Sequence, residues 1–267
     1  MRWSVICLAL AACTSERPLR LGTTHTVEQS GALALLDSLE PPGPVATIVA
    51  GSGQILRSAM QGDVDVVITH APAMEATRMD STHAVLRCPM VQSQFAIVGP
   101  PGDPAHVAAA RTAVDAMRRI ARVGAVFVTR GDSSGTHAKE LALWRAAGVD
   151  PSLEDWYIET GADQAANLRQ ADQWRAYALA DLPTLARQLG LELRALFSDD
   201  TALANPYTLY VTRVEPRHPI ADAFAAWAQS TWRDRWLDLK LPDGTPAFTA
   251  SPGACSTSWW REATPVP

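Results

Sequence analysis

Lysine is nearly missing from this 267-residue chain, which contains only Lys139 and Lys240, and its formal net charge is −5. Proteins that bind nucleic acid present a basic face, so this composition argues against a nucleic-acid partner. It does not argue against a small anion, because nearby arginines and backbone N–H groups set the potential of a small site. The length fits one large or two medium domains, and the hydrophobic content of 47% is enough for real cores.

A long hydrophobic stretch is also missing, because the mostly apolar run of residues 3–12 is far too short to span a bilayer. It follows the basic Arg2 and ends in Leu-Ala-Ala-Cys at Cys13, a pattern typical of a secretory signal. Leu-Ala-Ala-Cys also resembles a bacterial lipobox. We therefore expect residues 1–18 to be a lipoprotein signal peptide and tether, with Cys13 lipidated and the protein anchored by acyl chains alone. A plain signal peptide with an incidental cysteine is the alternative.

Cysteine is scarce, with four residues in all. Cys7 lies in the signal segment and Cys13 is the expected lipidation site, which leaves Cys88 and Cys255. Outside the cytoplasm two remaining cysteines often pair, so these two are candidates for a disulfide. Two separate buried thiols are the alternative.

Short β-rich runs alternate with amphipathic helical segments, a pattern that predicts an α/β fold. Strands are expected at 19–22, 45–50, 64–69, 84–88, 95–99, 125–129, 156–159, 177–180, 193–196 and 207–212. Helices are expected near 54–61, 105–121, 136–147, 163–170, 220–230 and 231–239. The Pro-rich tail after residue 240 is expected to be irregular, and the sequence contains no repeats.

The segment Phe-Val-Thr-Arg-Gly-Asp-Ser-Ser-Gly-Thr-His, residues 127–137, carries the most information about function. An apolar strand leads into Arg130, small hydroxyl residues and glycines follow, and a helix is expected to begin near Thr136. Unpaired N–H groups and partial positive charge at a helix N-terminus attract anions. Arg130 adds a forked and permanently charged donor, so the segment indicates a site for a small oxyanion.

Two further strand-to-helix turns have the same composition: Thr-Thr-His-Thr at 23–26 with Ser30-Gly31, and Ala-Gly-Ser-Gly at 50–53. Ser30 is a candidate helix cap. Each turn taken alone also fits an ordinary cap, because such turns need these residues for backbone geometry. Three of them together favour an anion site.

Five motifs occur in a fixed order. They are Thr-Thr-His-Thr at 23–26 with Ser30-Gly31, Gly-Ser-Gly-Gln at 51–54, His-Ala-Pro at 70–72, Arg-Gly-Asp-Ser-Ser-Gly-Thr-His at 130–137, and Asn-Pro-Tyr at 205–207. In these motifs the chain resembles the periplasmic tungstate-binding proteins of ABC importers, over nearly all of the chain after the signal segment.

The resemblance implies a two-lobed periplasmic-binding-protein fold of the venus-flytrap type II class, with the ligand held between the lobes. Lobe 1 is then discontinuous, residues 19–98 and 208–267, and lobe 2 comprises residues 99–207. Residues 95–99 and 207–212 would be the two crossings. Such an arrangement favours a hinge-closed state when ligand is bound.

The resemblance also implies a protein that is not an enzyme and needs no cofactor or metal, acting as a monomer outside the cytoplasm. Its ligand would be tungstate or a related oxyanion such as molybdate, and its partner an ABC permease in the cytoplasmic membrane. A dehydrated dianion needs many hydrogen-bond donors and few acceptors, with an arginine to offset charge. The expected ligand-binding residues are Thr24, His25, Ser52, Gly53, Arg130, Ser133, Ser134, Gly135 and Thr136.

Some positions depart from the family pattern. His25 stands where a threonine is usual, Val27 removes a hydroxyl, Ser133 replaces a common aspartate, and Leu182 follows Asp181 where an arginine is frequent. The histidines show no metal-ligand spacing. These departures bear on the ligand more than on the fold.

Two other functions compete with this interpretation. Residues 131–135 fit Gly-x-Ser-x-Gly between a strand and a helix, and Asp181 and His218 follow in the order of an α/β-hydrolase triad, with Ser133 as nucleophile. That pattern is short and leaves the other two loops unexplained. A sensor or assembly lipoprotein on the same fold is the other alternative, because a fold does not determine a function.

Overall fold

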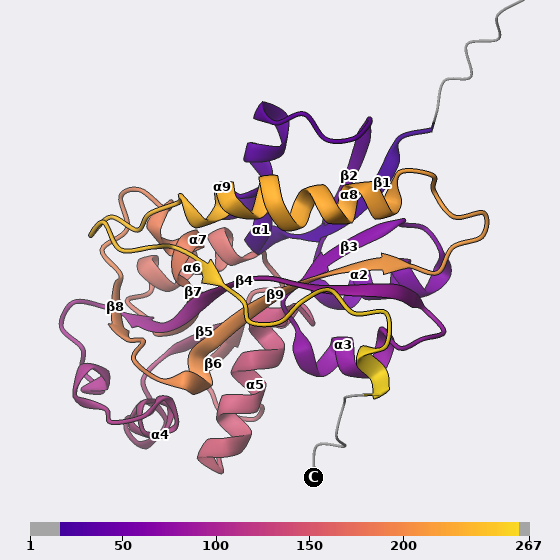
Figure 1. Cartoon of the computed structure of the whole chain (residues 1–267). Helices are drawn as coiled ribbons and strands as arrows, with labels where there is room; N and C mark the ends of the chain where they lie inside the picture. The colour runs from indigo at the N-terminus through magenta and orange to yellow at the C-terminus, as the bar shows by residue number, and fades with distance from the viewer. Residues whose placement is uncertain (1–16, 262–267) are drawn as a thin grey trace, which may run out of the picture.

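The computed structural model describes residues 17–261. The expected signal peptide and Cys13 lie outside these residues. Twisted sheets with helices packed on their faces make up the molecule, and the long strand β4 (Ala84–Gly99) runs through its middle (Figure 1).

The first part of the structure is a mixed sheet in the order β10-β4-β9-β3-β1-β2. Parallel pairing joins β1 to both β2 and β3, whereas β9 pairs antiparallel with β3 and with β4. Its other strands are β1 (Leu19–Thr24), β2 (Val45–Ala50), β3 (Val66–Thr69), β9 (Ala204–Thr212) and β10 (Thr249–Ala250). Its helices are α1 (His25–Gln29), η1 (Leu33–Ser38), α2 (Ser52–Gln61), α3 (Pro72–Arg78), α8 (Ala221–Trp227), η4 (Ala228–Trp232), α9 (Arg233–Leu237) and η5 (Trp259–Arg261).

The second part is built on the far end of β4, which pairs antiparallel with β7 (Ala178–Asp181) and β8 (Arg194–Phe197). A parallel pair, β5 (Phe127–Thr129) with β6 (Tyr157–Glu159), lies beside it. Its helices are η2 (Val107–Ala109), α4 (Ala113–Val123), α5 (Gly135–Ala147), α6 (Gln164–Gln173), α7 (Leu182–Ala186) and η3 (Thr201–Leu203).

The hydrophobic core divides in the same way. Two clusters draw only on residues before Phe95 or after Leu203, and the larger of them contains Phe224, Trp232 and Trp236. Two other clusters draw only on residues 95–203, among them Phe127. Two lobes with separate cores follow from this division.

Strands β4 and β9 pass between the lobes. Pairing of β4 with β9 ends at Gln94, opposite Ala204, and pairing of β4 with β7 begins at the next residue, Phe95. Residues 207–212 pair with β3 and β4 along the sheet of lobe 1. The lobe boundaries expected from the sequence stay a prediction.

Several element boundaries differ from the sequence expectation. The helix expected at 105–121 starts at Ala113, because the hydroxyl of Thr112 accepts a hydrogen bond from Asp115 N and caps the helix there. The tail after residue 240 is not wholly irregular, because β10 pairs with β4 at Val91 and Gln92. That pairing joins residues more than 150 positions apart, so no local sequence pattern predicts it.

A disulfide joins Cys88 on β4 to Cys255, with an S–S distance of 2.00 Å and a sequence separation of 167. The predicted pairing is thus present, within lobe 1. Beside it, Arg87 and Ser256 form an isolated antiparallel bridge. The disulfide attaches the C-terminal segment to the sheet.

We predict that reducing this disulfide lowers the melting temperature and leaves ligand affinity nearly unchanged. Chain-entropy arguments give about 5 kcal/mol, as an upper figure, for a closed loop of this length. Both sulfurs lie in lobe 1, so the bond does not restrain movement between the lobes. Calorimetric melting with and without reductant measures the effect. The double variant Cys88→Ala/Cys255→Ala is the control, since reductant should not change its melting temperature.

Candidate anion-binding site

Loops from both lobes meet at the carboxyl ends of parallel strands. In lobe 1, Thr24 at the end of β1 is paired in register with Ala50 at the end of β2, and β3 ends nearby at Thr69. In lobe 2, the parallel strands β5 and β6 end side by side at Thr129 and Glu159. Ligands of α/β proteins bind beyond such strand ends.

The N-terminus of α2 forms the lobe 1 side of the site. Gly51 caps the helix, and its carbonyl accepts hydrogen bonds from Gln54 N and Ile55 N. The N–H groups of Ser52 and Gly53, in the first turn, have no acceptor within the helix and carry part of its positive charge. Both residues are buried.

The N-terminus of α5 forms the lobe 2 side. Gly131 and Ser133 have φ angles of 63° and 57°, which turn the chain sharply after β5. Ser134 caps the helix by accepting a hydrogen bond from His137 N at 3.2 Å. The N–H groups of Gly135 and Thr136 are then the first of the helix and have no intrahelical acceptor.

The two N-termini lie against each other, and glycines permit the approach. A Cβ atom on Gly53 would stand only 2.9 Å from the carbonyl oxygen of Ser133. One on Gly135 would stand 2.9 Å from the imidazole of His70. Two helix N-termini that lie this close carry partial positive charge of the same sign. They repel each other unless a negative charge lies between them.

Arg130 is the cation of the site and is 2% exposed. Its guanidinium pairs with Asp132, whose other oxygen accepts a hydrogen bond from Ser134 N at 3.1 Å. Burial lowers the pKa of Arg130 and the Asp132 carboxylate opposes that effect, so the group stays charged. Asp132 therefore holds Arg130 in place, and its carboxylate faces the guanidinium of Arg130.

Three buried donors from these segments have no hydrogen-bond partner among residues 17–261: Ser52 Oγ, Arg130 Nε and Thr136 Oγ1. An unsatisfied buried polar group costs about 1–3 kcal/mol, and more when it is charged. Such groups are rare in a native protein unless something else binds them. These three come from both lobes.

A chain of hydrogen bonds lies behind the donors. Thr24 Oγ1 and Thr26 Oγ1 are 2.8 Å apart, and Thr26 Oγ1 lies 2.8 Å from His70 Nε2. His70 Nδ1 lies 2.9 Å from Asn205 Oδ1, which links the chain to the strand crossing. The sequence analysis did not name Thr26, His70 or Asn205 as ligand-binding residues, although all three lie in the motifs that carry the resemblance.

The remaining predicted residues fall into two groups. Thr24 and Ser134 are both 2% exposed, and Gly135 is also buried. The side chain of Ser133, in contrast, is exposed, and its N–H donates to His137 Nδ1. His25 is about one-third exposed, with Nδ1 3.7 Å from Glu28. The structure does not bring Ser133 or His25 into the set of buried donors.

The structure does not form a hydrolase triad. Ser133 has the positive φ of a nucleophile elbow, but Asp181 accepts hydrogen bonds from Ser93 and Asn205. His218 Nε2 bonds the carbonyl of Arg17 in lobe 1 instead. Both candidate partners of Ser133 are thus engaged elsewhere.

Contacts between the lobes keep the two halves of the site together. Gln29 of α1 accepts a hydrogen bond at 3.0 Å from Ala165 N in the first turn of α6. The Arg187 guanidinium of lobe 2 lies so near Gly31 that a Cβ there would stand 2.7 Å away. These contacts join the two lobes beside the site.

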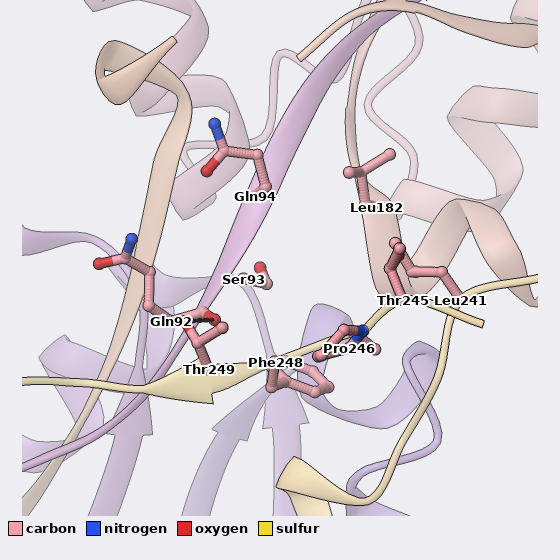
Figure 2. Close-up of a pocket in the computed structure, with 10 residues that line it drawn as sticks. Gln92, Ser93, Gln94, Leu182, Leu241, Thr245, Pro246, Phe248 and Thr249 are labelled. Atoms are coloured by element: carbon pink, nitrogen blue, oxygen red, sulfur yellow. Dashed lines mark hydrogen bonds between the residues drawn. The ribbon is translucent and has the colours of Figure 1, made fainter. Parts of the chain in front are cut away.

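A cavity of about 240 Å³ lies next to the strand crossing, between β4 and the C-terminal segment (Figure 2). Gln92, Gln94 and Phe248 are among its lining residues, and the described residues around it include no cationic side chain. It therefore lacks the donor set of an anion site. Within residues 17–261, no three His, Cys, Asp or Glu side chains gather as metal ligands, and no helix has both the length and the apolar character of a membrane span.

Comparisons with known proteins agree with this geometry. The model of the PBP superfamily domain matches residues 13–231. The tungstate-binding protein TupA of Peptoclostridium acidaminophilum is 31% identical, over 92% of this chain and 94% of its own length. The chain belongs to this family of binding proteins, within the PBP superfamily.

Other members support the assignment. The tungstate ABC transporter structure from Geobacter sulfurreducens superposes with a TM-score of 0.70 at 35% identity, covering 80% of this chain and 95% of that one. A protein of Haloferax volcanii named "Putative ABC transporter anion-binding protein" is 40% identical over 72% of this chain. The match spans 59% of that relative's length. The predicted fold class and family are confirmed, and these relatives are transport proteins and not enzymes.

We predict that Gly53→Ala weakens ligand binding at least tenfold without destabilising the protein. Its methyl group would meet Ser133 O at 2.9 Å and hold the lobes apart, whereas alanine itself favours a helix by about 0.5–1 kcal/mol. Gly51→Ala is the matched control, because its nearest neighbours would be at 3.7 Å, an ordinary contact. Equal affinities of the two variants, measured by calorimetry, would contradict the proposed closure contact.

Proposed function

We propose that this protein is an extracytoplasmic solute-binding lipoprotein that captures tungstate, or the closely similar molybdate, for an ABC importer. In this proposal Cys13 carries the lipid anchor, the protein acts as a monomer without a cofactor, and a permease in the cytoplasmic membrane receives the ligand. Family membership supports the transport role.

One observation carries the ligand class: Ser52 Oγ, Arg130 Nε and Thr136 Oγ1, on facing segments of the two lobes, are buried donors with no partner in the part of the chain that the structure describes. A tetrahedral oxyanion accepts hydrogen bonds in several directions at once. Placed between the segments, it would satisfy all three donors and the N–H groups of both helix N-termini. A neutral ligand would leave the partial positive charges of the two helix N-termini uncompensated.

The donor set also favours a fully ionised anion. Hydroxyl, guanidinium and N–H groups replace the water shell of a dianion, and the Asp132 carboxylate is already turned to Arg130 and Ser134 N. We therefore expect tungstate and molybdate to bind, since they have the same charge and nearly the same size. Phosphate, which is partly protonated at neutral pH, and sulfate, which is a smaller anion because its S–O bonds are shorter, should bind more weakly.

Of the residues expected from the sequence, we propose that Thr24, Ser52, Gly53, Arg130, Ser134, Gly135 and Thr136 form the site. Ser133 and His25 would line its outer edge. Opening at the β4 and β9 crossings would release the ligand, and the contacts between Gln29 and Ala165 N would break as it does so.

Calorimetric titration of the purified mature protein tests the proposal. Tungstate and molybdate should each bind at one site per chain, with sulfate and phosphate much weaker. If none of the four anions binds, or if sulfate binds as tightly as tungstate, the proposed ligand is wrong. Binding of tungstate with no loss of uptake in cells lacking the protein would favour the sensor lipoprotein instead.

We predict that Arg130→Ala weakens tungstate binding by about 30-fold to several thousandfold, because losing one partner of a buried charged contact costs about 2–5 kcal/mol. Arg130→Lys should restore only part of the affinity, since a point charge replaces a planar fork. Calorimetry gives the affinities and thermal melting checks folding. Arg122→Ala, an exposed arginine of α4, is the control and should bind like the wild type. Unchanged affinity in Arg130→Ala would remove this residue from the site.

A further inference from the structure

The hydrogen-bond chain from Asn205 through His70 and Thr26 to Thr24 fixes where each proton lies. Nδ2 of Asn205 is surrounded by oxygens, at 2.9 Å from Asp181 Oδ1 and 3.0 Å from Ser93 Oγ, so it donates to them. The amide oxygen of Asn205 therefore faces His70, and His70 Nδ1 must carry a proton to donate to it.

A neutral His70 then presents an unprotonated Nε2 to Thr26. Thr26 must donate its hydroxyl proton to Nε2, which leaves its oxygen to accept from Thr24. Thr24 therefore donates its hydroxyl proton to Thr26 and cannot donate it to a ligand. Thr24 would turn a lone pair toward the ligand, and a lone pair repels a dianion.

A second observation concerns charge. Arg130 is paired with Asp132, so the two together carry no net charge. The N-termini of α2 and α5 each supply about half an elementary charge. A bound dianion would therefore keep about one negative charge that these groups do not compensate, in a site with almost no exposure.

We propose that His70 takes up one proton as the oxyanion binds, and that this proton reverses the hydrogen bonds of Thr26 and Thr24. This inference rests on the proposed function. In the cationic state His70 Nε2 donates to Thr26, Thr26 donates to Thr24, and Thr24 is free to donate to the anion. The same proton supplies the missing positive charge.

The surroundings of His70 favour a proton only when the anion is present. Its ring is buried and stacks on Tyr207 at 5.1 Å between centroids. Burial, together with the nearby Arg130 and Lys139 cations, lowers its pKa to about 4, although Asn205 and Asp132 act in the opposite direction. A dianion beside the hydroxyl chain would raise this pKa.

The other ionisable groups on the elements packed around His70 already have partners. Glu75 of α3 accepts hydrogen bonds from Thr69 and Ala71 N, and Asp181 accepts from Ser93, Asn205 and Thr184. Lys139 of α5 donates to Ala202 O. Burial raises the pKa of both carboxyl groups, and a nearby anion would raise it further, so anion binding does not make either group release a proton.

The sign of the pH dependence follows. Free protein has neutral His70 at neutral pH, and the complex has the cation up to its own, higher pKa. Between these two pKa values, binding takes up a proton and affinity falls as pH rises, by about tenfold per unit. Above the pKa of the complex the dependence ends.

Calorimetry with tungstate at pH 7 to 9 tests the inference, using buffers of different ionisation enthalpy. The observed heat should vary with buffer, with a slope that approaches one proton taken up per anion at pH 7. Imidazole ¹⁵N spectra of His-labelled protein should show His70 neutral and Nδ1-protonated before tungstate addition and cationic after it. Binding with no proton uptake and a neutral His70 would overturn this inference while leaving the proposed function intact. No binding at all would overturn the proposed function instead.

A variant pair completes the test. His70→Gln should bind tungstate more weakly and show neither proton uptake nor a pH slope. His83→Gln, which replaces a partly exposed histidine paired with Asp80, should keep the wild-type slope. If His70→Gln kept the proton uptake, another group would be responsible and the inference would be wrong. If the variant failed to fold, the wild-type spectra would still decide.

Discussion

Positive charge that is buried without a full set of partners is the constraint on which the rest of this structure depends. The N-termini of α2 and α5, from different lobes, lie against each other, and Arg130 lies with them at 2% exposure. Desolvation and mutual repulsion both oppose this arrangement. A negative charge bound between the lobes, as we propose, would compensate for both effects.

The backbone geometry allows the two lobes to approach each other closely. Gly53 and Gly135 lack the side chains that would keep the lobes apart, and Gln29 of lobe 1 reaches an N–H group of α6 in lobe 2. These contacts are few and largely polar, whereas each lobe has its own aromatic core. Each lobe is therefore packed around its own core, and we expect the polar contacts between the lobes to control their closure.

Local sequence patterns predicted the α/β architecture and the loops that carry Ser52 and Arg130, because a turn after a strand and a helix start are encoded within a few residues. They did not predict the hydrogen-bonded chain from Thr24 to Asn205. Thr26 and His70 are 44 residues apart, and His70 and Asn205 are 135 apart, so only tertiary folding brings them together. The exposed position of Ser133 was not predicted either, because exposure depends on how the loop packs in the folded protein.

The most direct test is anomalous diffraction at a tungsten absorption edge, from crystals grown with tungstate. The account predicts one strong peak between α2 and α5, with oxygens of the anion about 2.7–3.2 Å from Ser52 Oγ, Arg130 Nε and Thr136 Oγ1. A peak elsewhere, such as in the cavity beside Phe248, or one that leaves these three donors without partners, would contradict it.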